Sequence, residues 1–357
     1  MACLCMLGLT PSCSRPAEPV DRHAPRSVSA TRATDSHRAS DHDSSRFAVE
    51  NSYPGVSEPH VGRSSVPTEL MVDENSAYNA GLFVDEDTIY VLTDHVAHRF
   101  VPGESPRQIP LENGTTGAVT RSGLVYWSTG AIWQVAGTGG KARRLASLDH
   151  QPQFFMAAGD DFAWLEMHER DRFLIQTLAR GRVRTLVDYA GRIETAALGA
   201  GRVFFVGRDR DSSWRIGSVS TRGGQATYAA PKTGPTPAKL AIAGDVFYYD
   251  VQSGEVRRLS ADLSHEETLL KDLVCSPLAV SVRIYCPNMD GMFELARHRG
   301  SKPMPLFPSR ERITAVAASS RYLVWLKDAG ADRLSLNMIP LVLDDAENAV
   351  RTSGVNP

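Results

Sequence analysis

The sequence predicts an all-β chain that folds as a β-propeller, with seven blades of four antiparallel strands each. Two observations predict this class. An aromatic-rich triplet recurs seven times, and most copies follow a run of small apolar residues and a polar turn. The repeat is close to 40 residues long and lacks helical periodicity, which is typical of propeller blades. Repeats three and four depart most from the pattern, so six or eight blades remain open.

Each triplet is interpreted as the second strand of a blade. The middle residues of successive triplets are 36, 37, 41, 43, 38 and 39 positions apart. The triplets are Ile89-Tyr90-Val91, Val125-Tyr126-Trp127, Phe162-Ala163-Trp164, Val203-Phe204-Phe205, Val246-Phe247-Tyr248, Ile284-Tyr285-Cys286 and Leu323-Val324-Trp325.

The small apolar runs before the triplets are interpreted as first strands. Blades converge on a central axis, so small side chains suit the crowded innermost strand, while aromatic side chains fill the wider space between blades. The runs are Ala118-Val119, Ala157-Ala158, Ala196-Ala197, Ala241-Ile242, Ala279-Val280 and Ala315-Val316-Ala317.

Turn residues separate the predicted strands. Between the first and second strands stand segments rich in Gly, Asp or Ser, such as Gly159-Asp160-Asp161. A second hairpin follows, with turns at 137–140 and 222–224 that join the third and fourth strands. These residue types adopt the backbone conformations that tight hairpins require.

These patterns resemble exported bacterial propellers of the TolB-like and NHL-like kind. Their units combine an Ala/Val strand, a Gly/Asp turn, a Tyr-Trp strand and a Gly-Gly turn. The resemblance covers about residues 78 to 345 and is architectural. It therefore implies a scaffold and no particular activity.

The chain divides by composition into a propeller and flanking segments. Residues 14–65 are polar and lack periodicity, which predicts a disordered tether. Apolar character returns at 66–72, and we expect this stretch to pair with the last blade and close the ring. The propeller is predicted to span residues 66–345, followed by a flexible C-terminal tail over 346–357.

The N-terminal segment 1–13 resembles the end of a bacterial lipoprotein signal. An apolar stretch is followed by Pro11-Ser12-Cys13, and lipid would attach at Cys13. Two features depart from that pattern: no Lys or Arg precedes the stretch, and Thr10 replaces a usual Leu. The alternative interpretation is a disordered apolar start with no targeting role.

Cys275 and Cys286 flank the first hairpin of the sixth repeat. A turn centred near Ser281-Val282 would set Cys286 opposite position 277, with Cys275 two residues away on the same face. A disulfide after a small register change is one interpretation, and an oxidising compartment would permit it. The other is a pair of buried thiols.

Composition and motifs exclude several functions. Hydrophobic and charged contents of 42% and 22% are ordinary for a globular chain, and the net charge of −2 supplies no basic field for nucleic acid. No complete catalytic motif is present. The sequence has no Gly-x-Ser-x-Gly elbow, and His168-Glu169 and His265-Glu266 both lack the second His of a zinc protease helix. Asp94, His95 and His98 could reach one metal ion only if their loop folded suitably, and they are interpreted as part of a solvated loop. The sequence thus predicts no catalytic residue, cofactor or metal.

Charged residues gather in the loops between second and third strands, which open on one face of a propeller. They offer a rim that could hold a cation, a sugar or a peptide. Solvation of the loops is the alternative explanation. The candidates are Asp94, Glu166, Arg170, Arg208, Asp209, Asp211, Asp250, Asp290 and Asp328, together with Arg210 and Lys327.

Two functional hypotheses follow. In the first, the chain is a non-catalytic, monomeric envelope protein, periplasmic or attached to the outer membrane by lipid, that binds a partner protein or polysaccharide at the rim. In the second, it is a hydrolase or lyase that uses a metal or a pair of carboxylates at the central channel. Bound Ca²⁺ or Zn²⁺ would discriminate between them.

Overall fold

A computed structural model describes residues 68–71, 81–93, 95–111, 116–230, 237–275, 277–288, 291–309, 312–329 and 333–341. The chain divides into two units, Met1–Val56 and Ser57–Pro357, and all described residues lie in the second. The predicted signal segment, tether and C-terminal tail therefore lie outside the described residues. Within these residues there are strands and turns, and no helix that could cross a membrane.

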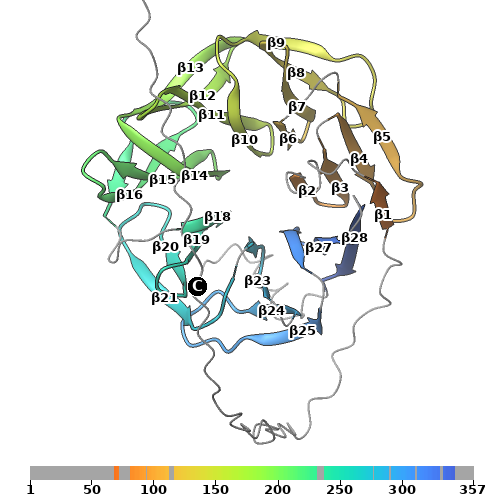
Figure 1. Cartoon of the computed structure of the whole chain (residues 1–357), viewed down its shortest axis with the longest axis vertical. Coiled ribbons are helices and arrows are strands. Elements are labelled where there is room, and N and C mark those ends of the chain that lie inside the picture. Colours follow the sequence, from red (N-terminus) through yellow and green to blue (C-terminus); the bar gives the residue numbers. More distant parts are fainter. Residues whose placement is uncertain are drawn as a thin grey trace, which may run out of the picture. The chain divides into compact units, whose positions relative to one another are not determined.

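Seven four-stranded antiparallel sheets form the blades of a β-propeller (Figure 1). Blade 1 consists of β2 (Gly81–Asp85), β3 (Thr88–Leu92), β4 (Val96–Phe100) and β5 (Arg107–Pro110). Blade 2 consists of β6 (Thr116–Thr120), β7 (Gly123–Ser128), β8 (Ala131–Val135) and β9 (Arg143–Ser147). Blade 3 consists of β10 (Pro152–Ala158), β11 (Asp161–Glu169), β12 (Arg172–Ala179) and β13 (Arg182–Tyr189).

The remaining blades repeat the same order. Blade 4 consists of β14 (Gly191–Gly199), β15 (Arg202–Asp209), β16 (Trp214–Ser220) and β17 (Thr227–Ala229). Blade 5 consists of β18 (Pro237–Ala243), β19 (Asp245–Asp250), β20 (Glu255–Leu259) and β21 (Glu266–Lys271). Blade 6 consists of β22 (Ala279–Val280), β23 (Ile284–Asn288), β24 (Gly291–Leu295) and β25 (Met304–Pro308). Blade 7 consists of β26 (Ile313–Ala318), β27 (Tyr322–Asp328), β28 (Arg333–Pro340) and β1 (Thr68–Met71).

The predicted strand assignment is confirmed. All seven triplets lie in the second strands, and the small apolar runs lie in the first strands. In blade 3 the first strand also carries Phe154, Phe155 and Met156 ahead of its two alanines. Phe155 and Met156 are buried, so the innermost strand of this blade is less restricted to small residues than expected.

The ring closes through two kinds of contact. The first strand of each blade contacts the first strand of the next, and β26 of blade 7 contacts β2 of blade 1. The N-terminal strand β1 pairs with β28, with Leu70 opposite Leu334. This pairing covers the edge of the last blade, as expected for a closing N-terminal strand. The blade count is seven, and the alternatives of six and eight are wrong.

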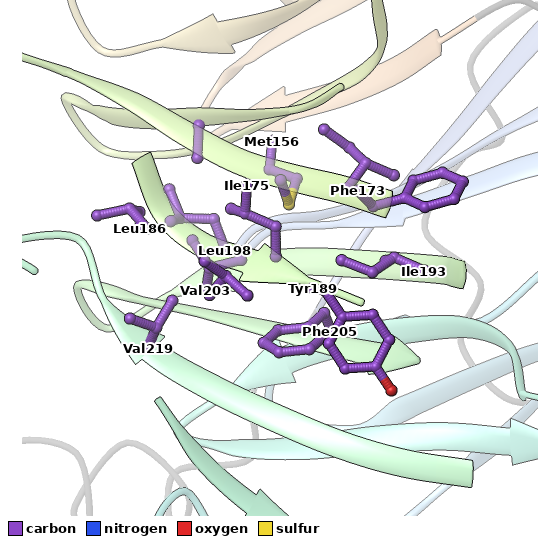
Figure 2. Close-up of a cluster of buried hydrophobic side chains, with 13 residues drawn as sticks. Met156, Phe173, Ile175, Leu186, Tyr189, Ile193, Leu198, Val203, Phe205 and Val219 are labelled. Atoms are coloured by element: carbon purple, nitrogen blue, oxygen red, sulfur yellow. The ribbon is translucent and has the colours of Figure 1, made fainter. Parts of the chain in front are cut away.

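Apolar side chains hold neighbouring blades together. Seven clusters of buried residues lie at the seven interfaces between blades. Figure 2 shows the cluster between blades 3 and 4, where the rings of Tyr189 and Phe205 lie together and the Tyr189 hydroxyl points away from the cluster. Burying one such large apolar side chain contributes roughly 1.5–3 kcal/mol.

A disulfide joins Cys275 and Cys286 at the interface between blades 5 and 6. Cys275 precedes β22 and its Cα lies 4.7 Å from that of Cys286 in β23. The predicted register was wrong by one residue. Val280 pairs with Ile284, so Cys286 is in line with Leu278 rather than with position 277.

Candidate functional site

One face of the propeller carries two sets of loops: those between second and third strands, and those that lead from each fourth strand into the next blade. Antiparallel order within each sheet places both sets at the same end of the blades. We call this the rim face. The turns between first and second strands, and between third and fourth strands, form the opposite face.

At blade 3 the rim face brings together His150, Glu166 and His168. Glu166 and His168 stand two residues apart near the end of β11, and His150 lies in the connection from β9 to β10. Side chains two residues apart on a strand point to the same face of the sheet. One ligand atom from each of the three residues lies within 4.8 Å of the other two.

The three residues differ in burial. Glu166 is only 5% exposed, whereas both histidines are exposed to solvent. The imidazole rings meet edge to face, with their centroids 5.2 Å apart and their planes at 84°. A buried carboxyl group therefore lies beside two exposed imidazoles, an arrangement that can bind a cation or exchange a proton.

Burial raises the pKa of the Glu166 carboxyl above its ordinary value. His150, the Trp164 indole and His168 act in the opposite direction, and Asp149 reinforces the rise. Among the described residues, no arginine or lysine forms an ion pair with Glu166. Glu166 is thus a buried acid whose charged form is disfavoured, and such groups cluster at functional sites.

Two other predicted rim residues hold their own loop in place. Asp209 accepts hydrogen bonds from the Tyr189 hydroxyl at 2.5 Å, from Ser213 Oγ at 3.2 Å and from Arg215 Nε. Desolvation raises the pKa of Asp209, but these hydrogen bonds outweigh it and hold the pKa below its usual range. Asp211 accepts a hydrogen bond from the Ser213 amide at 2.9 Å.

Asp250 is fully buried and organises the rim turn of blade 5. Its carboxylate accepts hydrogen bonds from the Gln252 amide at 3.0 Å and from Ser253 Oγ at 2.7 Å. Arg257 Nη2 lies 3.8 Å from Asp250 Oδ2 and 2.6 Å from Glu255 Oε2. These contacts explain Asp250 as a structural residue.

The remaining predicted residues do not converge on one point. Arg170 lies exposed in the turn after β11, and Arg208 lies over the Trp214 ring, 5.7 Å from its centroid. Lys327 and Asp328 end β27 on blade 7. Asp94 and Asp290 lie outside the described residues.

Sequence reasoning missed His150 and set His168 aside. The His168-Glu169 pair lacks the second His of a helical zinc motif, but His168 lies on a strand, where a neighbouring strand can supply a further ligand. The expected solvated loop near Asp94 was also partly wrong, because His98 is buried in β4 and desolvation lowers its pKa.

Comparison by sequence gives no family, because no family model and no curated protein matches the chain. Comparison by structure matches other propellers. A catalytically inactive virginiamycin B lyase from Staphylococcus aureus, crystallised with quinupristin, aligns with a TM-score of 0.56 and 11% identity, covering 78% of this chain and 99% of that one. A streptogramin B lyase aligns with a TM-score of 0.57 and 10% identity, covering 79% and 100%.

A CNH domain also aligns, with a TM-score of 0.50 and 9% identity, over 78% of this chain and 100% of that one. Identities at this level establish shared architecture alone. The fold defines the chain as a seven-bladed β-propeller. The neighbours include two lyases and a CNH domain, so they do not select an activity.

Proposed function

We propose that this propeller is a binding protein that takes up a partner protein or polysaccharide on its rim face. The observation that carries the proposal is Glu166, a buried carboxylate that forms no ion pair with a described arginine or lysine. Within the described part of the chain, Asp209, Asp211 and Asp250 accept hydrogen bonds from their own turns, whereas no such bond to the His150, Glu166 or His168 side chain is present. Groups that the fold does not need are candidates for recognition.

Exposed apolar residues on the same face support this proposal. Met167, between Glu166 and His168, is 47% exposed. Val251 in the rim turn of blade 5 is 51% exposed, and Val274 in the connection to blade 6 is 59% exposed. Mixed apolar and ionisable residues are typical of protein and ligand interfaces.

We further propose that the protein is exported and held at the envelope through Cys13. The apolar N-terminal stretch, the polar tether and the cysteine pair motivate this proposal. Fractionation of native cells that express wild-type or Cys13→Ala protein provides the test. We expect the variant to leave the membrane fraction, and wild-type protein found soluble in the cytoplasm would contradict the proposal.

Site-specific photo-crosslinking in native cells tests the rim as the binding face. A photoreactive residue is placed at Met167 or Arg170 on the rim face, and at Arg222 or Lys141 on the opposite face as matched exposed controls. We expect discrete crosslinked products from the rim positions alone. Equal products from both faces, or products only from Arg222 and Lys141, would refute a binding role for the rim.

A second candidate function is a hydrolase or lyase in which Glu166 acts as a proton acceptor or donor. The raised pKa of its carboxyl, between two imidazoles, favours this alternative. The test is release of reducing ends from a polysaccharide panel by metal-supplemented protein. Turnover by the wild type that is lost in Glu166→Gln would support catalysis. Equal turnover by the wild type and Glu166→Gln would argue against catalysis and in favour of the binding role.

A further inference from the structure

We propose that His150, Glu166 and His168 bind one divalent transition-metal ion of the zinc class. This goes beyond the proposed binding role, because it assigns a specific ligand that needs no partner. It also departs from the sequence-based expectation of no metal.

Strand register explains why these three residues meet. Pro152 of β10 pairs with Glu166 of β11, after a register shift between Pro152 and Phe154. Continuing this register by two residues beyond the start of β10 places His150 opposite His168. The pairing of β11 with β12 is also irregular between Met167 and Glu169, at His168 itself. Such irregularities re-aim side chains and are frequent next to functional sites.

The spacing of the ligand atoms suits one ion after a small adjustment. Zinc–nitrogen bonds of about 2.0–2.1 Å place two tetrahedral ligand atoms roughly 3.4 Å apart. The three ligand atoms lie within 4.8 Å of one another, so they must approach by at most about 1.4 Å. Both histidines are exposed and can rotate toward the buried carboxylate without repacking the core.

The electrostatics of the site favour a cation. A buried charge is costly unless it is paired or coordinates a metal. The charged or polar groups that act on the pKa of Glu166 are His150, Trp164, His168 and Asp149, and none of these is an arginine or lysine. A divalent ion would supply the missing positive charge and hold the Glu166 carboxyl ionised.

The donor set selects the kind of ion. Two imidazoles and one carboxylate suit zinc, copper, nickel or cobalt, whereas calcium and magnesium prefer an all-oxygen set. Three protein ligands leave a coordination position open. A carboxylate or hydroxyl group of a partner could occupy that position at the rim face. Asp188 lies close enough to His168 for the two to interact electrostatically, and its carboxylate accepts hydrogen bonds from Arg172 Nε at 2.8 Å and from Arg172 Nη2 at 2.5 Å.

Zinc titration by calorimetry tests the proposal on the full chain after treatment with EDTA. The variants are His150→Ala and His168→Ala, which change exposed side chains. The matched control is His265→Ala, an exposed histidine in the turn between β20 and β21 on the opposite face. Circular dichroism and melting without metal verify that all variants fold as the wild type does.

We expect one zinc equivalent that His265→Ala retains and that each rim variant weakens at least about 100-fold. Zinc should raise the melting temperature of the wild type and of His265→Ala only. Binding should weaken in acid, because protons compete with a metal ion for its ligand atoms. Added calcium or magnesium should not compete.

Cobalt as a probe gives an independent spectroscopic readout. Its visible absorption should appear on wild-type protein and disappear in the double variant His150→Ala/His168→Ala. The proposal is overturned if the double variant binds as many zinc ions as the wild type, with the same affinity. It is equally overturned if cobalt absorption is unchanged in that variant. Neither result depends on a partner, so both are separable from the crosslinking test.

Discussion

At the residue scale, the rim carboxylates differ in what the fold requires of them. Asp209 and Asp250 accept hydrogen bonds from their own turns, and Asp209 also ties blade 4 to Tyr189 of blade 3. Among the described residues, Glu166 forms no ion pair with an arginine or lysine and accepts no hydrogen bond from its own turn; its buried carboxyl lies beside Trp164, His150 and His168. This difference separates residues that build the loops from residues that are available for binding.

Tyr189→Phe tests the structural role of Asp209. The variant removes one hydrogen bond to a charged group, so we expect a loss of roughly 1.5–3 kcal/mol in the free energy of unfolding near neutral pH. The folded-state pKa of Asp209 is depressed. Its stabilising contribution is therefore present above the unfolded value of about 3.9 and is lost as the pH falls through the folded value.

Urea unfolding as a function of pH measures this effect. The difference between Tyr189→Phe and wild type should shrink in acid. Tyr228→Phe is the control, because the Tyr228 ring also meets Phe205 edge to face. A loss that is equal in the two variants, or that does not change with pH, would argue against the Tyr189–Asp209 bond.

Glu166→Gln should stabilise the metal-free protein near neutral pH. The folded-state pKa of Glu166 is raised, so its ionised form costs stability as the pH rises from the unfolded value of about 4.3 through the folded value. Below that window both side chains are neutral and the difference should vanish. Thermal melting with EDTA at several pH values is the measurement, with exposed Glu169→Gln as the control. If Glu166→Gln is less stable than the wild type at neutral pH, burial does not disfavour the ionised form of Glu166.

Only part of this site could be predicted from sequence. Glu166 was found because it follows a predicted second strand and precedes a predicted rim loop. His150 was not found, because an uninterrupted hairpin would continue the pairing of Phe154 with Leu165 and bring His150 opposite Glu169. The register shift near Gln153 brings it opposite His168 instead. A shift of this kind depends on tertiary packing, and the local sequence does not specify it.

At the scale of elements, strands and turns follow from local chemistry. The second strands were identified by β-branched and aromatic residues, which pack well on a pleated surface. Glycines with positive φ occupy the predicted turns, as at Gly139 and Gly140. Exact register was less accessible. The predicted pairing of Cys286 differs by one residue from the observed pairing. The turn at 281–283 sets this register, and the residue types of the turn do not specify its length to within one residue.

The Cys275–Cys286 disulfide should stabilise the contact between blades 5 and 6. It closes a loop with a sequence separation of 11, for which chain entropy gives about 3 kcal/mol. We expect Cys275→Ser/Cys286→Ser to lose a comparable free energy of unfolding. Thiol labelling in denaturant, before and after reduction, shows whether the native protein holds the bond. Complete labelling before reduction would contradict it.

Strand β1 should be required for a stable ring, whereas the segment before it should not. Deletion of residues 1–65 leaves β1 in place, and deletion of 1–72 exposes the edge of β28. We expect the shorter truncation to melt like the full chain and the longer one to melt about 5 °C or more lower. Equal melting temperatures of the two truncations would show that the β1–β28 pairing contributes little.

At the scale of the whole molecule, architecture and function have different sources. The ring tolerates degenerate repeats, since structures with 10–11% identity share it over most of their length. Seven interfaces between blades need only apolar side chains of suitable size, which a sequence pattern reveals. Under the proposed binding role, recognition depends on single residues of the rim loops, which the repeat does not constrain. The fold was therefore predictable from the repeat, whereas a ligand was not.

The claim that the rim face binds a metal ion can be checked by anomalous X-ray diffraction. Crystals of the full chain grown with zinc are measured at energies on either side of the zinc absorption edge. We predict one anomalous peak at blade 3, about 2.0–2.2 Å from a nitrogen of His150, a nitrogen of His168 and an oxygen of Glu166. Well-ordered side chains at these three positions without an anomalous peak would contradict the claim.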